Sequence, residues 1–201
     1  MIQLFIEGGP IMWPILVLSI FTLAVILERC FFIITEKKNT NPKAVEEVFS
    51  LVEHKKIEAA ILAGQESTDP LARILAHGLN HRSVSLSSGL VQAAGRELDR
   101  HNRGLVVLDT AVTLGPLLGL LGTVIGMIRA FGIIGGSDLA TQQTAITGGI
   151  AESLIAVTFG LGVAIVAIVP LNYLSSRMES TRRKIEDATN HLELLFGKHS
   201  T

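Results

Sequence analysis

The sequence predicts an all-α membrane protein with three transmembrane helices and helical cytoplasmic extensions. The 201 residues are 48% hydrophobic and have a mean hydropathy of +0.48, which is high for a soluble domain of this length. Three apolar runs are each long enough to cross a bilayer, which takes about 20 residues. No segment shows a convincing strand pattern of alternating apolar and polar residues.

These runs divide the chain into membrane and aqueous parts. In order, we expect a periplasmic N-terminus (1–10), a first transmembrane helix (11–34), a cytoplasmic helical segment (35–103), a second transmembrane helix (104–134), a periplasmic loop (135–147), a third transmembrane helix (148–174) and a cytoplasmic helical tail (175–201). The first run is not typical of a signal peptide, because it lacks a basic leader and a small-residue cleavage site and is longer than a usual h-region.

The positions of lysine and arginine predict the orientation. Of the 17 Lys and Arg residues, ten lie between Glu36 and Arg103 and five follow Leu174. The first ten residues contain none, and neither does the segment between the second and third spans. Because basic residues close to the span ends stay in the cytoplasm, the N-terminus is expected outside, and the middle segment and the C-terminus inside.

The cytoplasmic segment predicts helices rather than a folded enzyme domain. Asn41 and Pro42 have the residue types of a helix cap and first helical position, and we expect this helix to run to Gly64. Asp69 and Pro70 begin another helix. From "GLVQAAGRELDRHNRGLVVLD" onward, we expect one helix to continue from the cytosol into the second span.

The same segment lacks the motifs of catalysis. Its histidines have no metal-ligand spacing and the chain has one cysteine, so we expect neither a metal site nor an internal disulfide. Without a phosphate-binding loop or a nucleophile elbow, we expect no enzyme activity and no cofactor. Its basic residues alternate with acids and few aromatics accompany them, which disfavours nucleic-acid binding.

The stretch "GPLLGLLGTVIGMIRAF" combines glycines with a threonine and an arginine in an apolar run. Its small residues fall on one helix face at spacings of four, three and four: Gly115, Gly119, Gly122 and Gly126. The third span has a matching stripe: Gly149, Ala156, Gly160, Ala164 and Ala167. Because small residues let helix backbones approach in lipid, we expect the two faces to pack, within one chain or between copies.

Two charged residues lie in these spans. Arg129 is five residues from the end of the second span, about 7 Å, so its side chain can snorkel to the outer headgroups, with Asp138 as a possible partner. Glu152 lies just inside the third span, where a carboxylate usually faces a protein interior or a water path. A purely structural acid at the membrane interface is the alternative for Glu152.

Nearly the whole chain resembles the MotA/TolQ/ExbB proton-channel family. "GGPIMWPILVLSIFTLAVILER" is similar to the family's first span, "LDTAVTLGPLLGLLGTVIGMIRAF" to its second and "ITGGIAESLIAVTFGLGVAIVAIVPLNYL" to its third. "DPLARILAHGLNHR" resembles the cytoplasmic helix of small members. Three spans and a short cytoplasmic segment resemble the ExbB-like and TolQ-like members rather than the four-span MotA-type stators.

The resemblance implies a subunit of a motor complex in the bacterial inner membrane. Family members form homopentamers whose second and third spans line a pore, and a dimer of a single-span partner of the ExbD, TolR or MotB kind threads it. A membrane aspartate of the partner takes up and releases protons, and proton flow drives mechanical work or energised transport. A passive membrane scaffold without ion conduction is the alternative. A self-contained transporter is disfavoured because the chain has no internal repeat.

The resemblance also implies an ion pathway. Thr123 matches the family's pore threonine in "GTVxG", and Glu152 matches its third-span glutamate. A hydroxyl both donates and accepts hydrogen bonds, so Thr123 is suited to hold water beside a titrating carboxylate. Many members carry a second threonine five residues after the glutamate. Here Val157 occupies that position and the hydroxyl lies at Thr158, about 100° around the helix, which favours protons over sodium.

The predicted orientation is tested by cysteine labelling. A membrane-impermeant thiol reagent should label the variants Ser137→Cys and Thr144→Cys in intact cells, because both positions lie in the expected periplasmic loop. The variant Ser67→Cys should react only after the membrane is permeabilised. Labelling at position 67 in intact cells would reverse the orientation.

Overall fold

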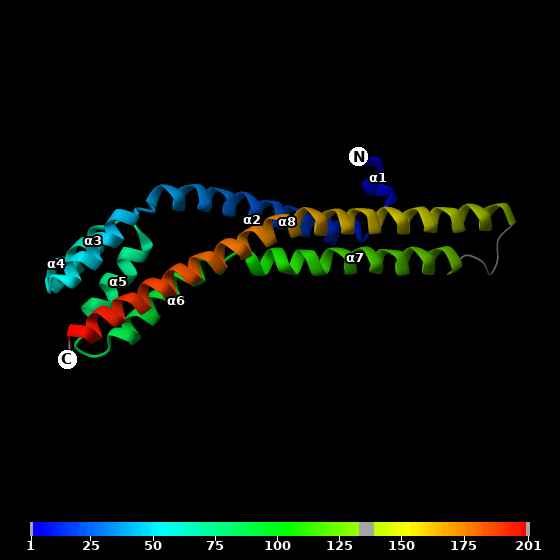
Figure 1. The fold of residues 1–201 in the computed structure, drawn as a ribbon. Helices are drawn as coiled ribbons and strands as arrows, with labels where there is room; N and C mark the ends of the chain where they lie inside the picture. The colour runs from blue at the N-terminus through cyan, green and yellow to red at the C-terminus, as the bar shows by residue number, and fades with distance from the viewer. Residues whose placement is uncertain (1, 133–138, 200–201) are drawn as a thin grey trace. The chain divides into compact units, whose positions relative to one another are not determined.

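The structure is a computed structural model that describes residues 2–132 and 139–199, and these ranges contain helices and no strands (Figure 1). The helices are α1 (Ile2–Glu7), α2 (Met12–Asn39), α3 (Pro42–Glu53), α4 (Ile57–Glu66), α5 (Pro70–Asn80), α6 (Leu86–Asn102), α7 (Leu105–Gly132) and α8 (Leu139–His199). Three stretches, in α2, α7 and α8, are long and apolar enough to cross a membrane. The predicted all-α membrane fold is confirmed.

The chain folds as two compact units. The membrane unit comprises Met1–Arg29 and Gly104–Leu174, and the polar unit comprises Cys30–Arg103 and Ser175–Thr201. The three apolar stretches lie mainly in the membrane unit, whereas α3 to α6 belong to the polar unit. Each unit has its own core of buried apolar side chains.

In the membrane unit, α7 and α8 run antiparallel and side by side along a line of small residues, here called the glycine seam (Figure 1). The seam consists of Gly115, Gly119, Gly122 and Gly126 on α7, and of Gly149, Ser153, Ala156 and Gly160 on α8. A Cβ atom added at Gly115 would lie 2.6 Å from the Gly160 carbonyl oxygen, and one at Gly119 would lie 3.0 Å from Val157 Cα. The small-residue faces are therefore buried against each other within one chain.

The start of α2 packs on the same pair of helices. Ile11, Met12 and Ile15 are buried against Ala156 and Val163 of α8. The chain reaches this position through a tight turn in which Gly9 has a φ of +73°, a conformation that side chains other than glycine rarely adopt.

The expected continuous helix from the cytosol into the second span is wrong. Helix α6 ends at Asn102, and α7 begins at Leu105 after Gly104, which has a φ of +83°. Glycine adopts this left-handed conformation without steric cost. The side chain of Arg29 also occupies the space beside Gly104, because an added Cβ would lie 3.2 Å from both its Cδ and Nε.

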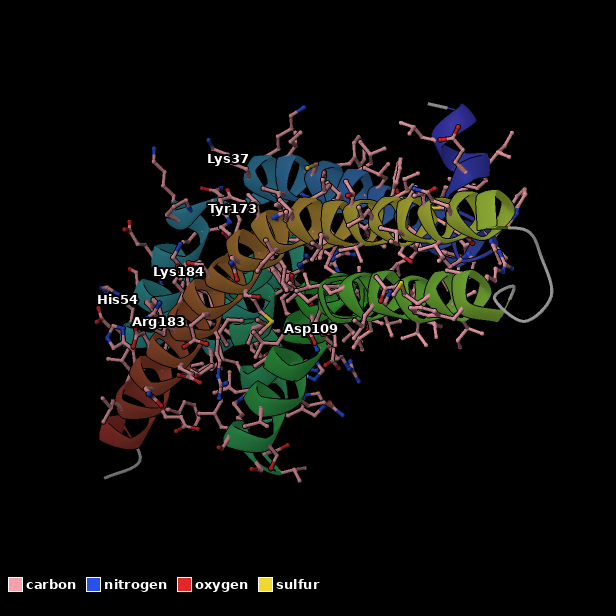
Figure 2. All side chains as sticks on the ribbon, turned by 90° about the vertical axis from the view of Figure 1, so that its right-hand side faces the viewer. Lys37, His54, Asp109, Tyr173, Arg183 and Lys184 are labelled. Atoms are coloured by element: carbon pink, nitrogen blue, oxygen red, sulfur yellow. The ribbon has the colours of Figure 1, made fainter. Side chains whose placement is uncertain are left out.

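The polar unit has a helical core built around α3 to α6. Its most buried apolar side chains include Val48, Val52, Ala60, Leu75, Leu79, Leu90, Ile185 and Leu192. The predicted helix start at Asp69 and Pro70 is confirmed, because the Asp69 carboxylate accepts a hydrogen bond from the Leu71 amide at 2.8 Å. Figure 2 shows side chains of this unit such as Lys37 on α2 and Arg183 and Lys184 on α8.

Two helix boundaries expected from the sequence, one in the cytoplasmic segment and one in the periplasmic loop, differ from the structure. The helix expected to run from Pro42 to Gly64 is divided at Lys55, whose φ is 60°, and this break lets both α3 and α4 direct side chains into one core. Helix α8 already begins at Leu139, so residues 139–147 of the expected loop are helical and contain no proline that would break the helix. Asp138 lies outside the described residues.

The close contact in the glycine seam predicts the effect of small substitutions. Gly115→Ala places a Cβ against a backbone carbonyl oxygen and should destabilise the protein by about 1–3 kcal/mol. Gly119→Leu should disrupt the helix pair more strongly. Gly162→Ala is the matched control, because no atom lies within 4 Å of its added Cβ and alanine favours the helix. Circular-dichroism melting in detergent should rank Gly115→Ala well below Gly162→Ala; equal stability would exclude the close contact.

Candidate ion-pathway site

A strip of polar residues follows α7 beside the glycine seam. Asp109, Thr113 and Thr123 recur with Pro116, Leu120 and Met127 at alternating spacings of four and three, which places all six on one helix face. Asp109 and Thr113 are exposed, and Thr123 is half-buried. This face, here called the polar strip, is thus accessible on the isolated chain. Figure 2 shows Asp109 on this helix.

The Thr123 hydroxyl donates a hydrogen bond to the Leu120 carbonyl oxygen at 2.6 Å. Its single proton is therefore used within the helix, and its remaining lone pairs can only accept hydrogen bonds. Beside it, Thr123 lines a shallow hollow on α7 with Val124, Met127 and Ile128. This oxygen can accept a hydrogen bond from a protonated carboxyl group or from a water molecule.

Ser153 connects the two helices at the level of Thr123. Its side chain is 5% exposed and occupies the space that Gly126 leaves open. Its hydroxyl lies 2.7 Å from the Gly149 carbonyl oxygen and 3.3 Å from the Thr123 carbonyl oxygen, and these two acceptors share its single proton. Our sequence analysis missed this serine, although its position on the small-residue face of α8 marks it as part of the seam.

Glu152 forms an ion pair with Arg129, with 2.8 Å between Oε1 and Nη1. The Glu152 side chain is 16% exposed and the Arg129 side chain 51%. The carboxylate also lies directly against Gly9, where an added Cβ would overlap Oε1. Three segments of the membrane unit thus meet at the Glu152 carboxylate. From the sequence, Arg129 was expected to reach the lipid headgroups or to pair with Asp138, and its contact with Glu152 was not predicted.

Thr158 lies apart from the other two candidate residues. It is exposed, donates to the Leu154 carbonyl oxygen at 2.8 Å, and lines a groove of about 370 Å³ with Ser19 and Thr22 of α2. Val157 directly precedes Thr158, and its backbone lies next to Gly119. Gly119 is one helical turn before Thr123. The structure therefore brings Thr123 and Glu152 to the seam and leaves Thr158 in a separate groove.

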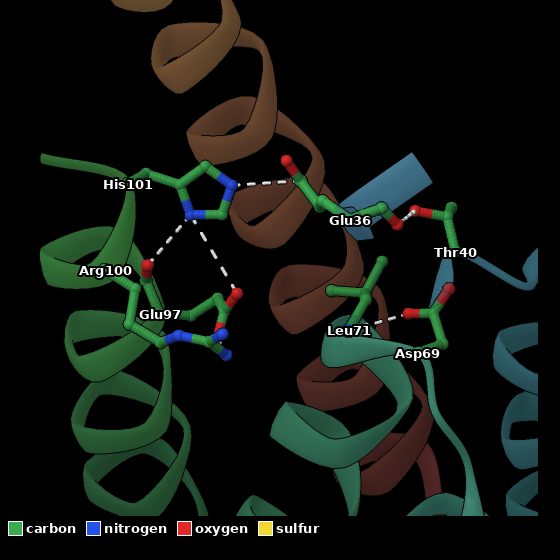
Figure 3. A network of polar contacts seen from close by, with 7 residues as sticks. All are labelled: Glu36, Thr40, Asp69, Leu71, Glu97, Arg100 and His101. Atoms are coloured by element: carbon green, nitrogen blue, oxygen red, sulfur yellow. Dashed lines mark hydrogen bonds and ion pairs between the residues drawn. The ribbon is translucent and has the colours of Figure 1, made fainter. Parts of the chain in front are cut away.

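The polar unit contains a buried ionic network that the sequence did not indicate (Figure 3). The His101 side chain is 7% exposed; its Nε2 lies 3.0 Å from Glu36 Oε1, and its Nδ1 lies 2.9 Å from the Glu97 carbonyl oxygen. Because both ring nitrogens face acceptors, the doubly protonated ring satisfies both contacts. The Arg100 guanidinium lies 3.3 Å from the Glu97 carboxylate. The spacing of these residues in the sequence does not indicate that they form a network.

Both partners of this network, which lie outside the expected spans, have shifted pKa values. The hydrogen bond to Glu36 raises the pKa of His101 above its usual 6.5, and burial opposes the shift. The hydrogen bond from His101 lowers the pKa of Glu36 below its usual 4.5, and the positive charges of Arg177 and Lys184 act in the same direction. Both shifts favour the charged forms, so His101 and Glu36 form an ion pair between about pH 4.5 and 6.5.

Comparison with known proteins identifies the family. Residues 66–187, more than half of the chain, match the family described as the MotA/TolQ/ExbB proton channel family. The chain belongs to this family. The matched residues include Thr123, Arg129, Glu152 and Ser153.

Individual relatives agree with the family assignment. The chain is 31% identical over 195 residues to an ExbB-like biopolymer transport protein of Synechocystis, covering 95% of this chain and 92% of the relative. It is 27% identical over 207 residues to biopolymer transport protein exbB1 of Vibrio cholerae, covering 96% and 86%. The Tol-Pal system protein TolQ of Haemophilus influenzae is 39% identical over 88 residues, which cover 44% of this chain and 38% of that protein. The chain is thus a membrane component of a proton-channel energising system rather than a member of an enzyme family.

The His101–Glu36 pair predicts a pH-dependent stability. Because the pKa of His101 is raised, its contribution is fully present below about pH 6.5 and is lost as the pH rises through the folded-state value. Because the pKa of Glu36 is lowered, its contribution is present above about pH 4.5 and is lost as the pH falls through its folded-state value. The pair should therefore stabilise the protein most between about pH 4.5 and 6.5.

The measurement is a series of thermal melts from pH 5 to 9. His101→Gln should lower stability by roughly 1–2 kcal/mol at pH 6, and the difference from wild type should shrink toward pH 9. His54→Gln is the control, because this exposed ring contacts the Ser50 carbonyl oxygen of its own helix. A constant difference between His101→Gln and wild type across this range would contradict the assigned ion pair.

Proposed function

We propose that this chain is the pore-lining subunit of an inner-membrane complex that couples the proton motive force to mechanical work or energised transport. The observation that carries the proposal is the polar strip, which includes Thr123. Asp109, Thr113 and Thr123 are polar groups on an apolar helix, and polar residues within the membrane usually face a cavity or another protein.

The described residues of the membrane unit do not cover this strip. The glycine seam occupies the neighbouring face of α7, and the start of α2 packs near Leu118 and Ile125 on a different face. In a homo-oligomer, the strip is therefore available to line a shared pore. A homopentamer that encloses a dimer of an ExbD-like or TolR-like single-span partner is the assembly we propose, by analogy with the ExbB and TolQ relatives.

In this assembly, Thr123 accepts a hydrogen bond from the partner's membrane carboxyl group or from a water molecule beside it. Because the Thr123 proton is bound to the Leu120 carbonyl oxygen, the hydroxyl favours the protonated, neutral form of that carboxyl group. Val157 replaces a second hydroxyl near this position, so the site offers few oxygen ligands for sodium, and we propose protons as the ion. The N-terminus is then periplasmic and the C-terminus cytoplasmic.

A passive scaffold is the alternative function, and the two threonines distinguish it from conduction. Thr123→Val removes the accepting oxygen and preserves the side-chain shape. An unpaired polar group in a dry site costs about 1–3 kcal/mol, so proton flux should fall roughly ten- to hundredfold while assembly is retained. The measurement is proton uptake by vesicles that contain this chain and the proposed ExbD-like or TolR-like single-span partner.

Thr158→Val is the matched control, because Thr158 also donates to a carbonyl oxygen of its own helix but lies in the groove beside α2. Its flux should stay close to wild type. Undiminished flux in Thr123→Val would remove this residue from the pathway and support the scaffold. A collapse of flux in Thr158→Val alone would mean that the pore-facing side of α8 is misassigned.

A further inference from the structure

Arg129 and Glu152 form a charged contact at the end of the membrane unit where α7 finishes and α8 begins. The two side chains come from different helices and meet at 2.8 Å. Glu152 is largely covered, and a covered carboxylate in apolar surroundings is unfavourable unless a positive charge compensates it. Among the described residues of the membrane unit, the ion pairs given by the structure are this one and Arg29–Glu28.

Gly9 completes the contact. The turn before α2 brings the Gly9 backbone directly against the Glu152 carboxylate, and any side chain at position 9 would overlap it. The positive φ of Gly9 independently disfavours other residues. The pair consequently holds the ends of α7 and α8 and the turn leading into α2 at one place.

The contact is coupled to Thr123 through the next residue of α8. Ser153 directly follows Glu152, and its hydroxyl lies within hydrogen-bond distance of the Thr123 carbonyl oxygen. A sliding of α8 along α7 would break both the Ser153 contact and the Arg129–Glu152 pair, because both depend on the same alignment of the helices. Arg129 lies six residues, about 9 Å, beyond Thr123 on α7.

We propose that Arg129 is a positioning residue that makes Glu152 a fixed anchor rather than a free carboxylate of the ion pathway. Arg129 holds α8 in the alignment that places Ser153 on Thr123, and it cancels the charge of Glu152 at the channel entrance. This inference rests on the proposed function for its effect on flux, while the ion pair itself is a property of the chain alone. In this proposal the Gly9 backbone is the surface against which the Glu152 carboxylate packs.

The flux test compares four variants and one control variant with the wild type, in vesicles that also contain the proposed ExbD-like or TolR-like single-span partner. Arg129→Gln and Glu152→Gln should each lower proton flux about tenfold, because either change leaves one charge without its partner. Arg129→Lys retains the charge and should keep flux within about twofold. The double variant Arg129→Gln/Glu152→Gln should not be slower than the slower single variant, because the two changes remove one shared interaction. Arg182→Gln is the control, since its pair with Glu186 has a similar length, 2.9 Å, but is exposed.

The stability test needs no partner. Trp13, the single tryptophan, contacts Phe5 near the Gly9 turn, so its fluorescence reports thermal unfolding at this place. The melting shifts of Arg129→Gln and Glu152→Gln should be strongly non-additive in the double variant. Gly9→Ala should lower the melting temperature in wild type by more than in Glu152→Ala, because the latter variant removes the atoms that the new Cβ would overlap.

The outcomes separate the two proposals. Wild-type flux in Arg129→Gln together with abolished flux in Glu152→Gln would show that Glu152 acts alone, and would overturn the positioning role. Additive melting shifts would overturn the ion pair itself. Absence of proton flux in the wild-type complex would refute the proposed function, whereas non-additive melting shifts would then still support Arg129 as the residue that anchors Glu152.

Discussion

Direct backbone contact between α7 and α8 is the constraint on which the membrane unit depends. Gly115, Gly119 and Gly160 have no side chains, so the two helices approach until backbone atoms of one helix limit the other. This approach fixes which faces remain free. Thr123 follows a seam glycine and therefore lies at the edge of the contact, while Thr158 lies on a side of α8 that faces a different groove. The positions of the two threonines are thus set by glycines, which have no side chains.

The two left-handed glycines of the described chain share a further property. Gly9 lies under the carboxylate of Glu152, and Gly104 lies under the side chain of Arg29, which pairs with Glu28 at 2.6 Å. In both places a backbone turn without a side chain makes room for a charged group that has an ionic partner. Charged side chains in apolar helices need compensation, and a bare backbone turn lets that compensation form close to the helix ends.

The helical periodicity and the apolar runs predicted the fold class, the three spans and the small-residue faces, because these signals repeat along a continuous segment. The breaks at Lys55 and Gly104 were not predicted. A single residue with positive φ leaves no periodic trace, and glycine is tolerated inside helices as well as between them. Helix α8 also begins earlier than expected, since residues 139–147 are polar without containing a residue that stops a helix.

The candidate site was only partly predictable for a related reason. Thr123 and Glu152 were predicted as ion-pathway residues because they are polar residues in apolar runs that match a known motif. The contacts of Glu152 with Arg129 and Gly9 join residues far apart in the chain, and their meeting depends on the alignment of α7 with α8, which no local pattern contains. The same holds for His101 and Glu36, which are separated by 65 residues.

The glycine seam also has a consequence for biogenesis. Helices in lipid associate mainly through packing, and a helix with an unmatched small-residue face must find a partner before it is stable. Here that face is already matched by the next span of the same polypeptide, and a short connection joins the two. The second and third spans can therefore leave the translocation machinery as a finished hairpin. In the proposed homo-oligomer, the contacts between copies therefore use surfaces other than the seam.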